Sequence, residues 1–141
     1  MSGAPVLYVE DEESDAFFMH HAFQRMGSAP PLMIVKNGRE ALDYLAGREP
    51  FSDRAQHQRP CLVLLDLNLP IMSGFEVLAW IRNQPQFNDM PVVIFSASRL
   101  DVDREHAMKS GAKDYIVKPN DMTSIPEILQ PVMAALADPA T

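Results

Sequence analysis

The chain places polar side chains directly behind several short apolar runs, and their chemical types suit one shared task. Carboxylates bind hard divalent cations such as Mg²⁺, which commonly takes one or two carboxylates together with water and phosphate oxygens. A lysine supplies a compact positive charge, and a serine supplies a hydroxyl donor. Such a set suits phosphoryl transfer, in which positioning and charge neutralisation do most of the catalysis. The candidates, in chain order, are Glu10 with Asp11, Asp66, Ser96 and Lys118.

Asp66 is the candidate nucleophile of this set. It follows the apolar residues 62–65, and a carboxylate can itself attack phosphorus to give an aspartyl phosphate. In this interpretation Mg²⁺ bridges Asp66 to the incoming phosphoryl group, while Lys118 and the Ser96 hydroxyl hold the remaining oxygens. Taken singly, each residue has a plainer explanation: the acidic pair as a helix cap, Ser96 as a turn residue and Lys118 as a solvated lysine. The joint pattern favours a site.

The positions of these residues depend on a regular alternation of strands and helices. Apolar runs predict five strands at Val6–Val9, Leu32–Val35, Cys61–Leu65, Val92–Phe95 and Tyr115–Val117. Helical spacing of apolar residues predicts helices over 18–26, 41–45, 74–82, 101–110 and 125–136. This order indicates an α/β fold, a doubly wound parallel sheet with right-handed crossovers and helices on both faces. Ligands of such sheets bind at the carboxyl ends of the strands, where the candidate residues lie.

Composition limits the classes of protein that remain. Nineteen acidic and twelve basic residues give a net charge of −7, which argues against direct binding of nucleic acid. One cysteine, Cys61, excludes an internal disulfide, and its apolar surroundings predict a thiol packed in the core. The sequence shows no signal peptide and no apolar run long enough to cross a bilayer. We expect a single cytoplasmic domain over residues 1–141, without membrane contact.

Two irregularities interrupt the pattern. Residues 47–60 form a long polar connection before the third predicted strand. A connection of this length is either a functional loop or a flexible surface segment, and the sequence does not decide between the two. Pro131 lies inside the last apolar stripe, where it removes a helical hydrogen bond. We therefore expect the last helix to be kinked or split there.

Read together, these motifs resemble the response-regulator receiver domain of two-component signalling, over residues 5–137. The resemblance implies a flavodoxin-like (βα)5 sheet of strand order 2-1-3-4-5. It also implies Mg²⁺ or Mn²⁺ as cofactor, and a cis peptide bond before Pro119. It assigns Glu10 and Asp11 as metal-binding acids, Asp66 as phospho-acceptor and metal ligand, Asn68 as a ligand through its backbone carbonyl, Ser96 and Ala97 as switch hydroxyl and small neighbour, Tyr115 as switch aromatic and Lys118 as the family's lysine.

The resemblance further implies a function. Asp66 would accept a phosphoryl group from a phosphohistidine of a sensor histidine kinase, Ser96 would move inward, and Tyr115 would rotate toward the vacated space. The protein would then switch its protein partners, with self-catalysed phosphotransfer and autodephosphorylation but no metabolic activity. The long 47–60 connection and the sequence around Asp66 are similar to stand-alone regulators of phytochrome-type kinases. Such relatives form homodimers through the face of the fourth helix, fifth strand and fifth helix.

Other functions remain open on the sequence alone. The chain could be a phosphorelay intermediate or a phosphate sink, which use the same chemistry. A metal-dependent phosphatase would need a second acid two residues after its nucleophile, where this chain has Asn68. A flavodoxin-like cofactor binder would need a phosphate-binding loop after the first strand, where this chain has Glu10 and Asp11, which repel phosphate without a metal.

Overall fold

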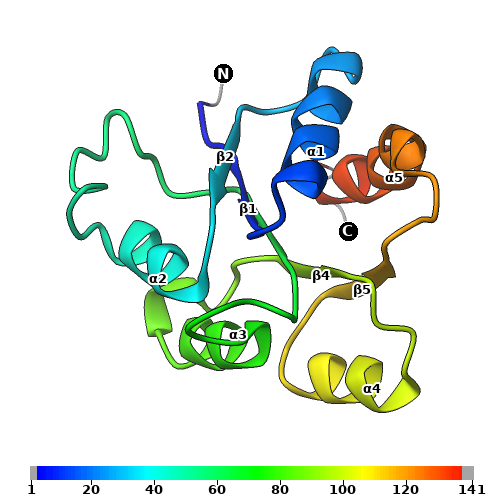
Figure 1. Ribbon diagram of the computed structural model, residues 1–141. Helices are drawn as coiled ribbons and strands as arrows, with labels where there is room; N and C mark the ends of the chain where they lie inside the picture. The colour runs from blue at the N-terminus through cyan, green and yellow to red at the C-terminus, as the bar shows by residue number, and fades with distance from the viewer. Residues whose placement is uncertain (1–2, 138–141) are drawn as a thin grey trace.

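Five parallel strands form the centre of the molecule, shown here as a computed structural model (Figure 1). The structure describes residues 3–137; of Ala137 it describes only the backbone. In chain order the strands are β1 (Val6–Val9), β2 (Leu32–Val35), β3 (Leu62–Leu65), β4 (Val92–Ser96) and β5 (Asp114–Val117). They are hydrogen-bonded in the order β2-β1-β3-β4-β5, so the expected flavodoxin-like (βα)5 topology is confirmed.

Helices cover both faces of this sheet. They are α1 (Glu13–Arg25), α2 (Gly38–Ala46), α3 (Gly74–Arg82), α4 (Asp101–Lys109) and α5 (Ile125–Ala137), with 3₁₀ turns at Pro85–Phe87 (η1) and Met122–Ser124 (η2). Figure 1 shows α1 and α5 together on one face and α2, α3 and α4 on the other. Within residues 3–137, no helix combines the length and the hydrophobicity that crossing a membrane requires.

Local sequence signals set the bounds of two of these helices. The side chain of Asn37 caps α2 by accepting a hydrogen bond from the backbone N–H of Glu40, and Gly47 ends the helix with a left-handed φ of 73°. Ser73 and Glu76 form a reciprocal capping box at the start of α3. Both helices therefore begin where the sequence itself supplies partners for the free N–H groups.

The register of the central strands places the first candidate residues side by side. Val9 at the end of β1 pairs with Leu65 at the end of β3. The next residues, Glu10 and Asp66, therefore leave the sheet at the same level and at the same edge. Lys118 directly follows β5, which lies at the border of the sheet beyond β4.

Alternation of side chains along the strands divides the core into two clusters. In β1, Val6 and Tyr8 pack toward α1 and α5, while Leu7 and Val9 pack toward α2, α3 and α4. All four side chains of β3 are buried as well. The uninterrupted apolar runs of the central strands reflect this cover on both faces.

The prediction that Cys61 packs in the core is wrong. β3 begins at Leu62, so Cys61 lies just outside the sheet, at its open amino edge, where the side chain is exposed. Its Sγ atom is 3.7 Å from the backbone carbonyl oxygen of Ala4. An apolar run in sequence thus extended one residue past the strand that it marks.

The structure corrects two predictions about prolines. α5 runs through Pro131 as one helix over Ile125–Ala137, so the helix is not split there, while the expected kink stays a prediction. The Pro131 side chain faces solvent, and Leu129 and Val132 on either side of it pack against the core. Among residues 3–137, the cis peptide bond is the one between Glu49 and Pro50 rather than the one before Pro119.

The connection over residues 47–60 is packed against α2 instead of standing free. The rings of Phe51 and His57 lie against Tyr44 and against each other, with centroids 5.2–5.9 Å apart. Arg54 donates hydrogen bonds to backbone carbonyls, including that of Tyr44 at 2.8 Å. Aromatic packing and a guanidinium at the end of α2 therefore fix the path of this segment.

Candidate functional site

Lys118 contacts three carboxylates at the carboxyl edge of the sheet. Its Nζ atom is 2.7 Å from Oε1 of Glu10, 2.6 Å from Oδ2 of Asp15 and 3.2 Å from Oδ2 of Asp66. An ammonium has three N–H donors, so each donor can meet one of these acceptors. The side chains are largely buried, with exposed fractions of 10% for Lys118, 0% for Glu10 and 7% for Asp66. The plainer explanation of Lys118 as a solvated lysine is therefore wrong.

The side chains converge because of their position in the pleat. Residues two positions apart in a strand share a face, and the residues two positions before Glu10, Asp66 and Lys118 all pack toward α1 and α5. The three side chains therefore turn toward the start of α1, where Asp15 lies in the first helical turn. Beneath them, the Tyr8 hydroxyl donates a hydrogen bond to Glu10 Oε1 at 2.9 Å.

The donor set at this edge fits a divalent cation. Glu10, Asp11 and Asp66 each offer a carboxylate oxygen, and these three atoms lie within 4.8 Å of one another. Ligands at about 2.1 Å from Mg²⁺ lie at most about 4.2 Å apart, so only a small contraction is needed. Asp11 is exposed while its two partners are buried, which leaves one side of the group open to water. Oxygen ligands with one open side are what Mg²⁺ and Mn²⁺ accept.

Burial and charge shift the protonation equilibria of the site. Burial raises the pKa of the Glu10 carboxyl to about 7, although the hydrogen bond from Lys118 opposes this shift. For Lys118, burial lowers the pKa, but the hydrogen bonds to Asp15 and Glu10 outweigh burial, so that the pKa lies above its usual value. Burial and the neighbouring Glu10 raise the pKa of the Tyr8 phenol. Lys118 therefore stays charged, and Tyr8 stays a donor.

Ser96 and Tyr115 lie inside the protein but belong to a neighbouring network. Ser96 is fully buried, and its Oγ accepts a hydrogen bond from the backbone N–H of Ser98 at 3.3 Å. The Tyr115 hydroxyl donates to the carbonyl oxygen of Ser98 at 2.9 Å. Ala97, which lies between Ser96 and Ser98 in the sequence, is exposed. The inward movement of Ser96 on phosphorylation, which the resemblance implies, stays a prediction.

The loop between β3 and α3 is held tightly around Asp66. The backbone N–H of Asn68 donates to Asp66 Oδ1 at 3.3 Å, while the Asn68 side chain is exposed. A Cβ atom at Gly74 would overlap the backbone of Asp66, so only glycine fits at that position. Ile71 has a φ of 73° and an 80% exposed side chain. A β-branched residue at positive φ stores strain of about 1–3 kcal/mol.

Two residues of the site were missed from the sequence. They are Asp15 and Ser98. Asp15 lies in the first turn of α1, where the N-cap Glu12 forms no capping hydrogen bond through its side chain, and it pairs with Lys118. No spacing in the sequence indicates this pair, because Asp15 and Lys118 are 103 residues apart. Ser98 carried no signal either, because it takes part through its backbone carbonyl oxygen.

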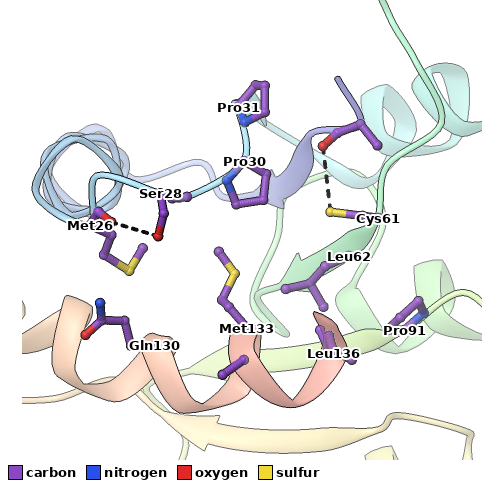
Figure 2. Close-up of a pocket in the computed structure, with 13 residues that line it drawn as sticks. Met26, Ser28, Pro30, Pro31, Cys61, Leu62, Pro91, Gln130, Met133 and Leu136 are labelled. Atoms are coloured by element: carbon purple, nitrogen blue, oxygen red, sulfur yellow. Dashed lines mark hydrogen bonds between the residues drawn. The ribbon is translucent and has the colours of Figure 1, made fainter. Parts of the chain in front are cut away.

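A cavity lies at the opposite end of the sheet, near residues that precede the strands (Figure 2). Its volume is about 790 Å³, and most of its lining is apolar, with Leu62, Met133 and Leu136 among the side chains around it. Figure 2 shows Cys61 at its margin, with the thiol directed toward the carbonyl oxygen of Ala4. None of the candidate residues lines this cavity. The cavity and the candidate residues therefore lie at different ends of the sheet.

Comparisons with known proteins agree with this geometry. The sequence model of the response regulator receiver domain family matches residues 6–130 of this chain. The phosphorylated cyanobacterial phytochrome response regulator RcpA is 29% identical and has a TM-score of 0.87, with 99% of this chain and 98% of that chain covered. The Mn²⁺-bound response regulator Rcp1 is 26% identical and has a TM-score of 0.84, with coverage of 98% and 97%. The polar-differentiation response regulator DivK of Brucella anthropi is 29% identical, with 94% of this chain and 96% of that protein covered. The chain therefore belongs to the family of response regulator receiver domains.

Proposed function

We propose that this receiver domain accepts a phosphoryl group on Asp66 from a sensor histidine kinase and then changes its protein partners. Receiver domains are phospho-acceptors that take phosphate from histidine kinases and are generally not enzymes. The observation that carries the assignment to Asp66 is the contact of its carboxylate with the Lys118 ammonium, 3.2 Å away, beside the oxygens of Glu10 and Asp11.

The transfer step forms one bond and breaks another. A carboxylate oxygen of Asp66 attacks phosphorus, while the bond between phosphorus and the kinase imidazole nitrogen breaks. That nitrogen keeps the electron pair and takes up a proton from solvent, so the charge balance is closed. Lys118 then donates to one phosphoryl oxygen, and the Ser96 hydroxyl turns toward another. Self-catalysed hydrolysis of the resulting acyl phosphate returns Asp66 to the carboxylate.

The acidic group would hold the metal that this step needs. Glu10, Asp11 and Asp66 would bind Mg²⁺ or Mn²⁺, with the backbone carbonyl of Asn68 as a further ligand. When bound, the cation supplies positive charge beside the phosphoryl oxygens. The spacing of the three carboxylate oxygens supports this assignment, as does the Mn²⁺-bound form of the similar protein Rcp1.

A phosphorylation assay tests the assignment. The purified chain is incubated with Mg²⁺ and acetyl phosphate, and the intact mass is measured. We expect a gain of one phosphoryl group that alkali removes and that Asp66→Asn abolishes. Asp89→Asn is the matched control, because Asp89 is an exposed aspartate that precedes β4. A gain that survives in Asp66→Asn would show that another residue is the acceptor.

The surface that changes partners would be the face of α4, β5 and α5. Large apolar side chains at the start of α4 support this proposal, since Leu100 is 62% and Val102 is 65% exposed. Tyr115 of β5 is hydrogen-bonded to the loop after β4, so it can pass a change at Ser96 to this face. Sedimentation with and without beryllofluoride, an analogue of the phosphoryl group, tests whether the face forms a homodimer. An unchanged mass in both states would contradict dimerisation.

The kinase upstream would be of the phytochrome type. The support is the similarity to the phytochrome response regulator RcpA over nearly the whole chain. Transfer of labelled phosphate from a purified phytochrome kinase, faster than from an unrelated histidine kinase, is the expected result. Direct binding of nucleic acid is not expected from the net charge of −7. The single domain over residues 1–141 and the cytoplasmic location stay predictions from the sequence.

The alternative functions are less favoured than this one. A metal-dependent phosphatase needs an acid that protonates the leaving group, and the amide of Asn68 cannot do so at the corresponding position. A relay intermediate or a phosphate sink would use the same chemistry at Asp66, and would differ only in the fate of the phosphoryl group. Release of phosphate from a phosphomonoester with many turnovers would return the phosphatase to consideration.

A further inference from the structure

A fourth carboxylate, that of Asp15, is part of the site. Its Oδ2 atom lies 2.6 Å from Lys118 Nζ, the shortest of the three ion pairs that this lysine makes. Asp15 comes from α1 and not from a strand end, and it is outside the group of three acids that could hold a metal. Its carboxylate therefore contacts Lys118 and is not among the three acids proposed to bind the metal.

The contacts of Lys118 leave no N–H for a further acceptor. Its three donors can meet the oxygens of Glu10, Asp15 and Asp66. A phosphoryl group on Asp66 would also require a donor from this lysine, so one of the present contacts has to be given up. The ion pair with Asp15 is thus in competition with a phosphoryl group.

The exposure of the three partners indicates which contact yields. The Asp15 side chain is 21% exposed, against 0% for Glu10 and 7% for Asp66. Water can replace the lysine at Asp15, whereas a buried carboxylate that loses its partner stays unpaired at high cost. Glu10 also remains fixed by the hydrogen bond from Tyr8. Asp15 is therefore the partner that Lys118 can leave at the lowest cost.

We propose that Asp15 is a positioning residue that holds Lys118 away from the phosphoryl position, and so sets how tightly the site binds a phosphoryl group. This inference rests on the proposed function of Asp66. The charge of Asp15 acts in the same direction as its contact, because a nearby carboxylate repels an incoming anion and attracts a cation. Loss of that charge should therefore tighten anion binding and weaken cation binding.

The substitution Asp15→Asn tests the inference through two binding constants measured by titration calorimetry. At saturating Mg²⁺, we expect beryllofluoride to bind to Asp15→Asn about tenfold more tightly than to the wild-type chain. A neighbouring charge commonly changes a protonation equilibrium by about one pKa unit, which is a factor of about ten, and we expect an effect of the same size on anion binding. In a separate titration with Mg²⁺ alone, we expect binding that is about threefold weaker. Changes of opposite sign distinguish this role from a merely structural one, because a loosened site would bind both ligands more weakly.

Two further variants serve as controls. Glu13→Gln removes the same charge from the same helical turn, at an exposed residue that forms no ion pair with Lys118 in the described range. We expect less than about a twofold change in either constant, since exposed charges are screened. Asp15→Glu keeps the carboxylate and should return both constants toward the wild-type values. Circular dichroism spectra confirm that each variant is folded.

The outcomes separate this inference from the proposed function. Failure of the wild-type chain to bind beryllofluoride would overturn both. Binding by the wild-type chain with the same constants in Asp15→Asn and Glu13→Gln would overturn the positioning role alone. Weaker binding of both ligands to Asp15→Asn would also overturn it, because Asp15 would then be a structural support of the site.

Discussion

The amino and carboxyl ends of the strands build two different surfaces from one sheet. At the amino ends lies a cavity of about 790 Å³ with a largely apolar lining. At the carboxyl ends, four carboxylates and one lysine lie in close proximity, three of the carboxylates in direct contact with the ammonium. The cavity and the charged group thus lie at opposite ends of the sheet. The candidate residues for chemistry lie at the charged end, and none of them lines the cavity.

The same strand shows this difference at its two ends. Lys113 precedes β5 and is exposed, whereas Lys118 follows β5 and is almost covered by its carboxylate partners. An exposed lysine contributes little to stability, while a buried one becomes necessary to the carboxylates around it. The following experiments compare the two ends, from the largest expected effect to the smallest.

The largest effect is expected from Lys118→Met in the absence of metal. At pH 8 the substitution leaves buried carboxylates without a counter-charge, and we expect a loss of about 3 kcal/mol in the free energy of unfolding. Lys113→Met, at the other end of β5, should cost less than about 0.5 kcal/mol. Urea unfolding measures both values. Mg²⁺ should restore part of the loss in Lys118→Met, since it supplies positive charge. Equal losses of unfolding free energy in the two variants would contradict the expected difference between the two ends of β5.

A second effect concerns pH. Burial raises the pKa of Glu10 from 4.5 to about 7, so the stability that protonated Glu10 gives the metal-free fold is present below pH 4.5 and is lost as pH rises through 7. A cation needs the ionised carboxylate, so Mg²⁺ affinity should change in the opposite direction. We expect about tenfold weaker Mg²⁺ binding at pH 6 than at pH 8, measured by calorimetry. Glu10→Gln should remove most of this dependence; a wild-type affinity that is flat between these pH values would contradict the assignment.

A smaller effect is expected from the strained loop at the carboxyl end. Ile71→Gly should raise the free energy of unfolding by about 1 kcal/mol, because glycine adopts a φ of 73° without strain and the isoleucine side chain is mostly exposed. Ile71→Ala is the matched control, since alanine keeps the Cβ atom and most of the strain. Chemical unfolding compares the three proteins. A loss of stability in Ile71→Gly would mean that the side chain makes contacts worth more than the strain.

The smallest effect is expected at the amino end. Cys61→Ser should change the free energy of unfolding by less than about 0.5 kcal/mol, because the thiol is exposed and outside the strand. Phosphorylation by acetyl phosphate should proceed at the wild-type rate. A marked slowing of phosphorylation in Cys61→Ser would show that the amino and carboxyl ends of the sheet are coupled, and would contradict the view that they act independently.

Much of the fold could be predicted from the sequence because apolar periodicity is a local property. Five strands, five helices and the edge that carries the polar residues follow from residue spacing, and the strand order follows from the resemblance. Errors arose where neighbours in space override the local pattern. Cys61 belongs to an apolar run but lies outside β3, and Pro131 sits within a helix that packing on both sides keeps whole.

The sequence by itself determined which residues end the strands, and therefore that Glu10, Asp66 and Lys118 share one edge. Only the tertiary structure decided that Asp15 joins them and that Ser98 links Ser96 with the strand beside it. The physical reason lies in distance along the chain. Spacing within a segment fixes which face a side chain takes, but Asp15 and Lys118 are 103 residues apart, and only the packing of α1 against the sheet brings a helix carboxylate to a strand-end ammonium.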